Sequence, residues 1–176
     1  MVVTGGHLLQ EQGNTIELIK KDGFIPAKIF DAKVNNSSAF EITQTMARMS
    51  SLFSEAFNEL KPDCLIVLGD RYELLPICNA AYMQEIPIAH ICGGDVTEGA
   101  LDDGVRNAVT MLATYHFPSN PESAKNIIRM CNSDKNVFTL GSPSLDIFRH
   151  CEILSREQLA KNLSLNTSEK WTLMTL

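Results

Sequence analysis

The chain has 176 residues and a formal net charge of −6 at pH 7, from 15 basic and 21 acidic side chains, which argues against nucleic acid as a partner. Its composition, 44% hydrophobic and 20% charged, is typical of a globular protein with one domain, or one domain and a tail. No apolar run approaches the ~20 residues of a membrane span and no signal peptide is recognisable, so we expect a cytoplasmic protein with no membrane partner.

Short apolar runs and amphipathic patterns alternate in the first part of the chain. Up to residue 62 we expect the end of a strand at 1–4, a helix capped by Asn14 and reaching Lys21, a strand at 28–31, and a helix over 37–60 that Pro62 ends. Six large apolar side chains of the last helix have helical spacing and are expected in the core rather than around a cofactor: Phe40, Met46, Met49, Phe53, Phe57 and Leu60.

From residue 64 the pattern is strand, polar turn, helix and strand again, which predicts an α/β fold with a parallel sheet. We expect strands at 65–68, 88–91, 115–117 and 137–140, and helices at 73–84, 105–113 (capped by Asp102 or Asp103) and 121–130. After the turn at 141–143 we expect a short helix, a helix with a Ser155/Gln158 capping box, and a truncated strand at 171–176.

Charged side chains gather where two of these strands end. Ligands of parallel sheets bind beyond the carboxyl ends of the strands. A carboxylate-rich pocket with two arginines there indicates acid–base chemistry on a polar, phosphorylated substrate. The side chains concerned are Asp70, Arg71, Glu73, Asp95, Glu98, Asp102, Asp103 and Arg106.

Structural roles remain open for the same residues. Asp70 could cap the next helix, the loop at 93–99 could be a solvated acidic loop, and Asp102 and Asp103 could simply complement a helix dipole. Arg106 could pair with these two acids or hold a phosphate. Gly93 and Gly94 permit close approach of a ligand, although the sequence has no GxGxxG or P-loop pattern.

The histidines divide by position. His90 ends an apolar strand at the rim of the expected pocket, which fits both a hydrogen-bonded structural role and a functional one. His7 stands at another strand end with weaker support. His116 is expected in the core and His150 at the surface.

The five cysteines are scattered and form no CxxC pair. Cys64, Cys78 and Cys92 are expected to be buried thiols, and Cys92 has no activating partner in the sequence. Because neither the cysteines nor the acids have ligand spacing, we expect no metal and no cofactor.

Four segments carry a resemblance to a known family: VTGGHLLQEQGNT (3–15), LKPDCLIVLGDRYE (60–73), IPIAHICGGDVTEGALDDGVRNAVT (86–110) and VFTLGSPSLD (137–146). The chain resembles the hydrolysing UDP-N-acetylglucosamine 2-epimerases of sialic acid biosynthesis. The resemblance implies a Rossmann-like parallel sheet with flanking helices, the N-terminal half of a GT-B-like two-domain enzyme. It implies a domain at 1–150 without its first strand and loop, and a linker helix with the start of a truncated C-terminal domain at 151–176.

The implied partner is a UDP-sugar, and the full-length protein is expected to be a homo-oligomer, a dimer or a tetramer. The implied reaction removes the C2 proton with loss of UDP to give a glycal, and then adds water to give N-acetylmannosamine. By the resemblance, Asp70 and Asp102 match catalytic carboxylates and His90 a histidine implicated in catalysis. His7 matches a weaker histidine and Arg106 a basic residue of the same helix. The residues expected to bind substrate are His7, Arg71, Glu73, Gly93, Gly94, Asp103, Arg106 and Ser142.

Three departures from the family pattern matter. Cys92 stands where relatives have Glu or His, Asn107 where they have His, and Met111 where they often have Lys. Either Asp95 or Glu98 takes over the lost role, or the substrate differs, or the activity is weakened. Three functions therefore stay open: hydrolysing UDP-N-acetylglucosamine 2-epimerase, a related enzyme for a UDP-2,4-diacetamido-trideoxy sugar, or an inactive UDP-sugar-binding fragment.

Overall fold

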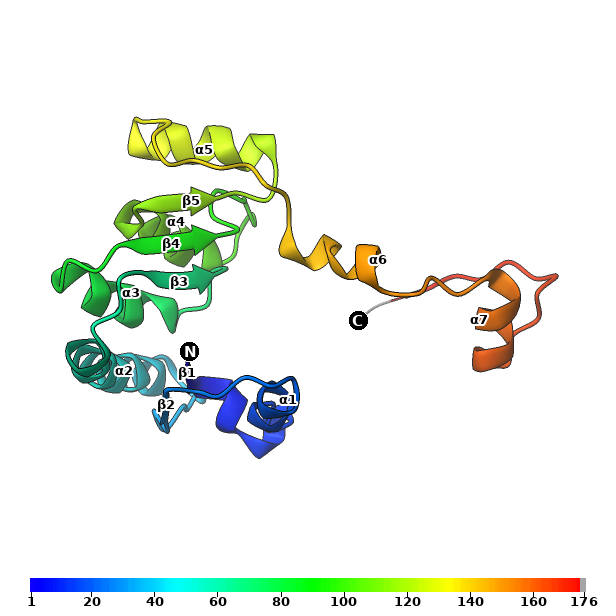
Figure 1. Ribbon diagram of the computed structural model, residues 1–176, viewed down its shortest axis with the longest axis horizontal. Helices are drawn as coiled ribbons and strands as arrows, with labels where there is room; N and C mark the ends of the chain where they lie inside the picture. Colours follow the sequence, from blue (N-terminus) through cyan, green and yellow to red (C-terminus); the bar gives the residue numbers. More distant parts are fainter. Residues whose placement is uncertain (175–176) are drawn as a thin grey trace. The chain divides into compact units, whose positions relative to one another are not determined.

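The computed structural model describes residues 1–174, without the side chain of Arg149 (Figure 1). Contacts divide the chain into two units, Met1–Gly141 and Ser142–Leu176, earlier than the boundary predicted after residue 150. Within the described residues, no helix is long and apolar enough to cross a membrane.

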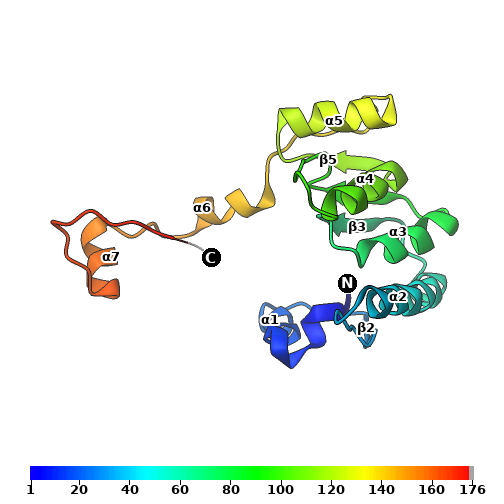
Figure 2. The same cartoon turned by 180° about the vertical axis from the view of Figure 1, so that it is seen from behind.

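The first unit contains two parallel sheets. In one, β1 (Val2–Thr4) pairs with β2 (Lys28–Phe30). In the other, β3 (Leu65–Leu68), β4 (Ile88–Ile91) and β5 (Tyr115–Phe117) pair in that order, as seen from both sides in Figures 1 and 2. Strand β4 is flanked on both sides, and its first three residues are buried, as expected for a central parallel strand. The predicted parallel α/β sheet is therefore confirmed.

Four helices connect these strands, α1 (Ile16–Lys21), α2 (Ala39–Leu60), α3 (Leu74–Met83) and α4 (Asp102–Leu112), and α5 (Pro121–Cys131) follows β5. Two 3₁₀ turns, Gly5–Leu8 and Gln10–Gln12, precede α1. The Ser38 hydroxyl caps α2 by accepting from Glu41 N, and Asn120 caps α5. Two predicted caps were wrong. Thr15 rather than Asn14 precedes α1, and α4 begins at Asp102 after Leu101, which places both acids inside its first turn.

The hydrophobic core lies between β3 and helices α2, α3 and α4. Phe53 and Phe57 of α2 pack edge to face, with ring centroids 5.6 Å apart, against Val67 and Ile77. Burial of each such side chain contributes roughly 1.5–3 kcal/mol. Phe40 and Leu60, both predicted in the core, are instead 67% and 40% exposed, because they occupy the first and last turns of α2, beyond the packed part of the helix.

Two of the predicted buried thiols differ from expectation. Cys64 is exposed, because it precedes β3 rather than lying in it, and Cys92 is only partly buried. Cys78 of α3 is buried, and this burial raises the pKa of its thiol to about 12. The predicted strand at 137–140 is also absent: Val137 forms a single parallel bridge with His116, and the chain then turns at Gly141.

The second unit contains a 3₁₀ turn (Pro143–Leu145), α6 (Ile147–His150) and α7 (Arg156–Leu163). The predicted capping box of Ser155 and Gln158 is confirmed at the start of α7. The guanidinium of Arg156 lies 4.0 Å from the centroid of the Trp171 ring. Residues 171–174 have no regular secondary structure, contrary to the predicted strand, and residues 175–176 lie outside the described part.

A groove of about 880 Å³ lies between β1 and β3. All four residues of β3 line it, together with Met1, Val2 and Thr4. Because successive side chains of a strand point to opposite faces, a groove that contacts all four must run along the strand edge. The described residues place no strand on this edge of β3. Ile66 and Leu68 are accordingly 68% and 58% exposed.

Amide hydrogen exchange tests this arrangement. The N–H groups of Leu65 and Gly69 donate toward β4, to the carbonyl oxygens of Pro87 and Ile91 (2.8 and 3.0 Å), so those of Ile66 and Leu68 point into the groove. We expect Ile66 and Leu68 to exchange at least about 10-fold faster than Leu65 and Gly69. Equal protection of all four amides would contradict an open edge.

Candidate active site

Parallel pairing brings two loops to the same edge of the sheet. Gly69 N donates to Ile91 O and Cys92 N donates to Phe117 O, and the N···O distance is 3.0 Å in each bond. The loops after β3 and β4 therefore leave the sheet side by side. Asp70 belongs to the first loop, and Asp95 and Glu98 belong to the second.

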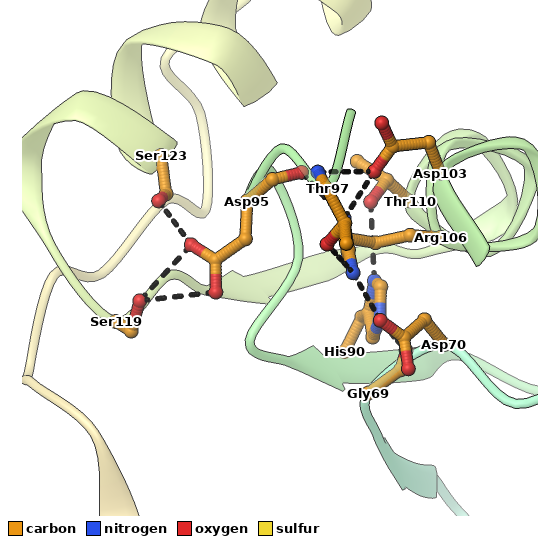
Figure 3. A network of polar contacts seen from close by, with 10 residues as sticks. All are labelled: Gly69, Asp70, His90, Asp95, Thr97, Asp103, Arg106, Thr110, Ser119 and Ser123. Atoms are coloured by element: carbon orange, nitrogen blue, oxygen red, sulfur yellow. Dashed lines mark hydrogen bonds and ion pairs between the residues drawn. The ribbon is translucent and has the colours of Figure 1, made fainter. Parts of the chain in front are cut away.

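Arg106 of α4 joins these loops, although it is only 4% exposed. Its Nη1 donates to Asp95 O (2.8 Å) and Asp103 Oδ1 (2.5 Å), and its Nη2 donates to Thr97 Oγ1 (3.0 Å) and Asp70 Oδ2 (Figure 3). These four acceptors match the four terminal N–H groups of a guanidinium. Burial alone would lower the pKa of Arg106, but its bonds and charge interactions with Asp70 and Asp103 outweigh this and raise it.

Asp95 points away from Asp70 and toward α5 (Figure 3). Its carboxylate accepts from Ser119 Oγ (3.1 and 3.4 Å) and from Ser123 Oγ. The side chain thus attaches the loop at 93–99 to the start of α5, while its carbonyl oxygen serves Arg106.

His90 lies beneath this network with a fully buried side chain. Its Nε2 is 2.8 Å from the carbonyl oxygen of Gly69 and its Nδ1 is 3.2 Å from Thr110 Oγ1. Burial is the main cause that lowers the pKa of His90, and the nearby His116 and Arg106 lower it further. The Gly69 carbonyl and Asp70 oppose this shift only in part.

The two glycines of the loop lie in close contact with neighbouring protein atoms. A Cβ on Gly93 would lie 2.8 Å from His90 Nδ1 and 2.9 Å from Thr110 Oγ1. A Cβ on Gly94 would lie 2.2 Å from the carbonyl oxygen of Ser123, and its φ of +81° is also unfavourable for other residues. Both glycines are buried.

Three other predicted contacts belong to the groove between β1 and β3. His7, Arg71 and Glu73 all line it. Arg71 donates to both carboxylate oxygens of Glu73 (2.7 and 3.2 Å), and this interaction is the main cause that raises the pKa of Arg71. His7 Nδ1 lies 2.7 Å from Thr15 Oγ1.

Three further predicted site residues, Glu98, Asp102 and Ser142, take no part in the hydrogen bonds described above. Glu98 and Asp102 are exposed, and their carboxylates make no hydrogen bond or ion pair with any described residue. Ser142 belongs to the second unit, where its hydroxyl contacts Ser144 (2.6 Å). Cys92 has a left-handed backbone (φ 62°), and burial, aided by Asp95 and Asp70, raises the pKa of its thiol.

Sequence reasoning missed four hydroxyl groups of this network. Thr97, Thr110, Ser119 and Ser123 contact Arg106, His90 and Asp95. Only Thr110 had a local signal, because it follows Arg106 by one helical turn. Across the described residues, no group of three or more His, Cys, Asp or Glu could hold a metal ion.

The fold and this edge of the sheet define a parallel α/β domain whose carboxylates gather at the carboxyl ends of β3 and β4 (Figure 3). The structure of the Neisseria meningitidis UDP-GlcNAc 2-epimerase bound to UDP-GlcNAc matches with a TM-score of 0.69 at 20% identity, over 93% of this chain and 43% of that one. A putative Listeria monocytogenes UDP-N-acetylglucosamine 2-epimerase gives 0.74 at 15% identity, over 93% and 42%. The profile of the UDP-N-acetylglucosamine 2-epimerase family matches residues 1–176, and the chain belongs to this family.

Curated relatives are similar along nearly the whole chain. A Campylobacter jejuni GDP/UDP-N,N'-diacetylbacillosamine 2-epimerase (hydrolyzing) is 33% identical over 99% of this chain and 45% of its own length. The Escherichia coli polysialic acid biosynthesis protein P7 is 34% identical over 81% and 36%. The chain therefore spans less than half the length of these relatives. The family and the Rossmann-like, GT-B-like fold class predicted from the sequence are confirmed.

The close packing at Gly94 can be tested with a matched pair of variants. Gly94→Ala forces a Cβ against the Ser123 carbonyl at positive φ, and we expect a loss of more than about 2 kcal/mol of unfolding free energy. Gly104→Ala meets no atom within 4 Å in α4 and should gain up to about 1 kcal/mol. Urea denaturation measures both, and a neutral Gly94→Ala would contradict the packing.

The buried histidines predict a pH dependence of stability. Burial lowers the pKa of both His90 and His116 below the ordinary 6.5. The unfolded chain therefore binds more protons below about pH 6.5, and the unfolding free energy must fall as the pH drops through this region. Urea denaturation at about pH 7.5 and about pH 5.5 measures the fall. Because Nδ1 of His116 has no hydrogen-bond partner in the described structure, His116→Leu should reduce the fall. An unchanged fall would exclude His116 as a source.

Proposed function

We propose that residues 1–176 form the carboxylate-bearing half of a hydrolysing UDP-sugar 2-epimerase. The observation that carries the proposal is Asp70, fixed at the carboxyl end of β3 by the buried Arg106, with Asp102 exposed in the first turn of α4. The reaction would proceed by elimination of UDP to a glycal, followed by addition of water.

The chemistry requires two carboxylates with different tasks. A C2 hydrogen beside an amide nitrogen is weakly acidic, so departure of the pyrophosphate must lead and positive charge develops on the sugar ring. Asp70, ion-paired with Arg106, supplies a fixed negative charge for this cation. Asp102, whose carboxylate is exposed, acts as the base that removes the C2 proton of the sugar. Burial, with Asp95 and Asp70 nearby, raises the pKa of the Cys92 thiol, which disfavours Cys92 as the base.

The sugar is proposed to be a UDP-2-acetamido sugar that the enzyme hydrolyses, giving an N-acetylmannosamine-type product. Relatives named for UDP-N,N'-diacetylbacillosamine from Campylobacter jejuni and Legionella pneumophila are 33% and 31% identical. The Neisseria meningitidis UDP-N-acetylglucosamine 2-epimerase is 22% identical. These identities favour the 2,4-diacetamido-trideoxy sugar over UDP-N-acetylglucosamine.

A binding module without catalysis is the second candidate. The replacements at Cys92, Asn107 and Met111 support it, since they remove acid–base and phosphate groups expected from the resemblance. Binding of a UDP-sugar without release of UDP would favour this candidate.

A chimaera tests the proposal in a complete polypeptide. Residues 1–176 replace the matching segment of the Campylobacter jejuni relative, and release of UDP is measured from both candidate sugars. We expect turnover, and we expect Asp70→Asn and Asp102→Asn each to lower kcat by about 10² or more. Asp63→Asn, an exposed aspartate before the amino end of β3, is the matched control.

Two outcomes would count against the proposal. Near-normal rates in both Asn variants would remove these carboxylates from the mechanism. Sugar-nucleotide binding by a chimaera that never releases UDP would favour the binding module. The isolated 176-residue chain is expected to release no UDP, because it spans less than half the length of its relatives.

A further inference from the structure

We propose that His90 is a positioning residue that fixes the backbone at Gly69 and Asp70 as a neutral Nε2–H imidazole and transfers no proton to or from the substrate. The proposal rests on the proposed function only for the task of Asp70. It departs from the catalytic role that the family resemblance implied for this histidine.

The two ring contacts indicate which nitrogen of the neutral His90 ring carries the hydrogen. The carbonyl oxygen of Gly69 can only accept, so the Nε2 atom 2.8 Å away must carry the hydrogen. The unprotonated Nδ1 then accepts from the hydroxyl of Thr110, 3.2 Å away. With both nitrogens engaged and the side chain fully buried, no ring atom is available to a substrate.

The surroundings of the ring keep it neutral. Arg106 from α4 and His116 from β5 face it as positive or potentially positive groups, and Asp70 is the acid that opposes them. Gly93 closes the remaining side, because a Cβ there would lie 2.8 Å from Nδ1. A protonated imidazole would keep this contact only in the reverse direction, with Nδ1–H donating to the Thr110 hydroxyl.

Two residues on one face of α4 therefore fix Asp70, one through its carboxylate and one through the preceding carbonyl group. Arg106 and Thr110 are one helical turn apart. Arg106 holds the Asp70 carboxylate directly, and Thr110 holds the preceding carbonyl through His90 (Figure 3). Gly69 has a left-handed backbone (φ +82°), and the bond to His90 Nε2 fixes the direction of its carbonyl group. Loss of the His90 bond should displace Asp70 relative to Arg106.

The first experiment is nitrogen NMR of the histidine rings in the 176-residue chain. We expect His90, assigned by the signal lost in His90→Gln, to be the Nε2–H tautomer and to stay neutral from about pH 8 to about pH 6. An imidazolium at neutral pH, or the Nδ1–H tautomer, would overturn the proposal. This measurement needs no enzymatic activity.

The second experiment compares His90→Gln with His90→Asn in the chimaera. The Gln amide nitrogen reaches the position of Nε2 and can donate to Gly69, whereas the shorter Asn cannot; neither side chain titrates. We expect Gln to retain at least about 10-fold more kcat than Asn, with a pH profile of kcat like that of the unmodified chimaera. Equal losses in both variants, with loss of one limb of the profile, would identify a proton-transfer group and overturn the proposal.

The two experiments distinguish a failure of the proposed function from a failure of the positioning role of His90. A chimaera with no turnover on either sugar contradicts the proposed function, but the tautomer still decides the role of His90. In the isolated chain, the backbone amide signals of Asp70 and Arg71 should shift more in His90→Asn than in His90→Gln. Equal shifts would count against positioning. If the Asn variant does not fold, the tautomer of the unmodified chain decides between positioning and proton transfer.

Discussion

The buried guanidinium of Arg106 is the constraint on which the carboxyl edge of this sheet depends. A charged group removed from water is costly unless it is paired and its hydrogen bonds are satisfied. Four acceptors must therefore converge on Arg106, and they come from the loop after β3, the loop after β4 and α4 itself. This requirement fixes the two loops relative to the helix, and so gives Asp70 a defined place.

Contacts of the loop after β4 with α5 and His90 stabilise this arrangement. Asp95 attaches its loop to α5 through Ser119 and Ser123, so that its carbonyl can face Arg106. Gly93 and Gly94 let the loop lie directly against His90 and α5. The start of this loop is therefore packed against protein, whereas residues 96–99 are exposed.

Local patterns were sufficient for much of the fold. The apolar runs of β3, β4 and β5, the spacing along α2 and the capping box at Ser155 depend on neighbouring residues, and the sequence carries them directly. Partners distant in sequence were not predictable. Ser119 and Ser123 lie 24 and 28 residues from Asp95, and Arg106 lies 36 residues from Asp70. The residue types indicated a polar site, but only the register of parallel strands determines which acid meets which base.

The charges at this edge also indicate which part of a nucleotide sugar it suits. Arg106 is paired with Asp70 and Asp103, and Arg71 with Glu73, so neither arginine offers an uncompensated charge to a phosphate. Glu98 and Asp102 remain exposed as additional acids. An edge with excess negative charge repels a diphosphate but stabilises positive charge on a sugar ring. We therefore infer that this edge meets the sugar, and that cationic groups outside it must hold the diphosphate.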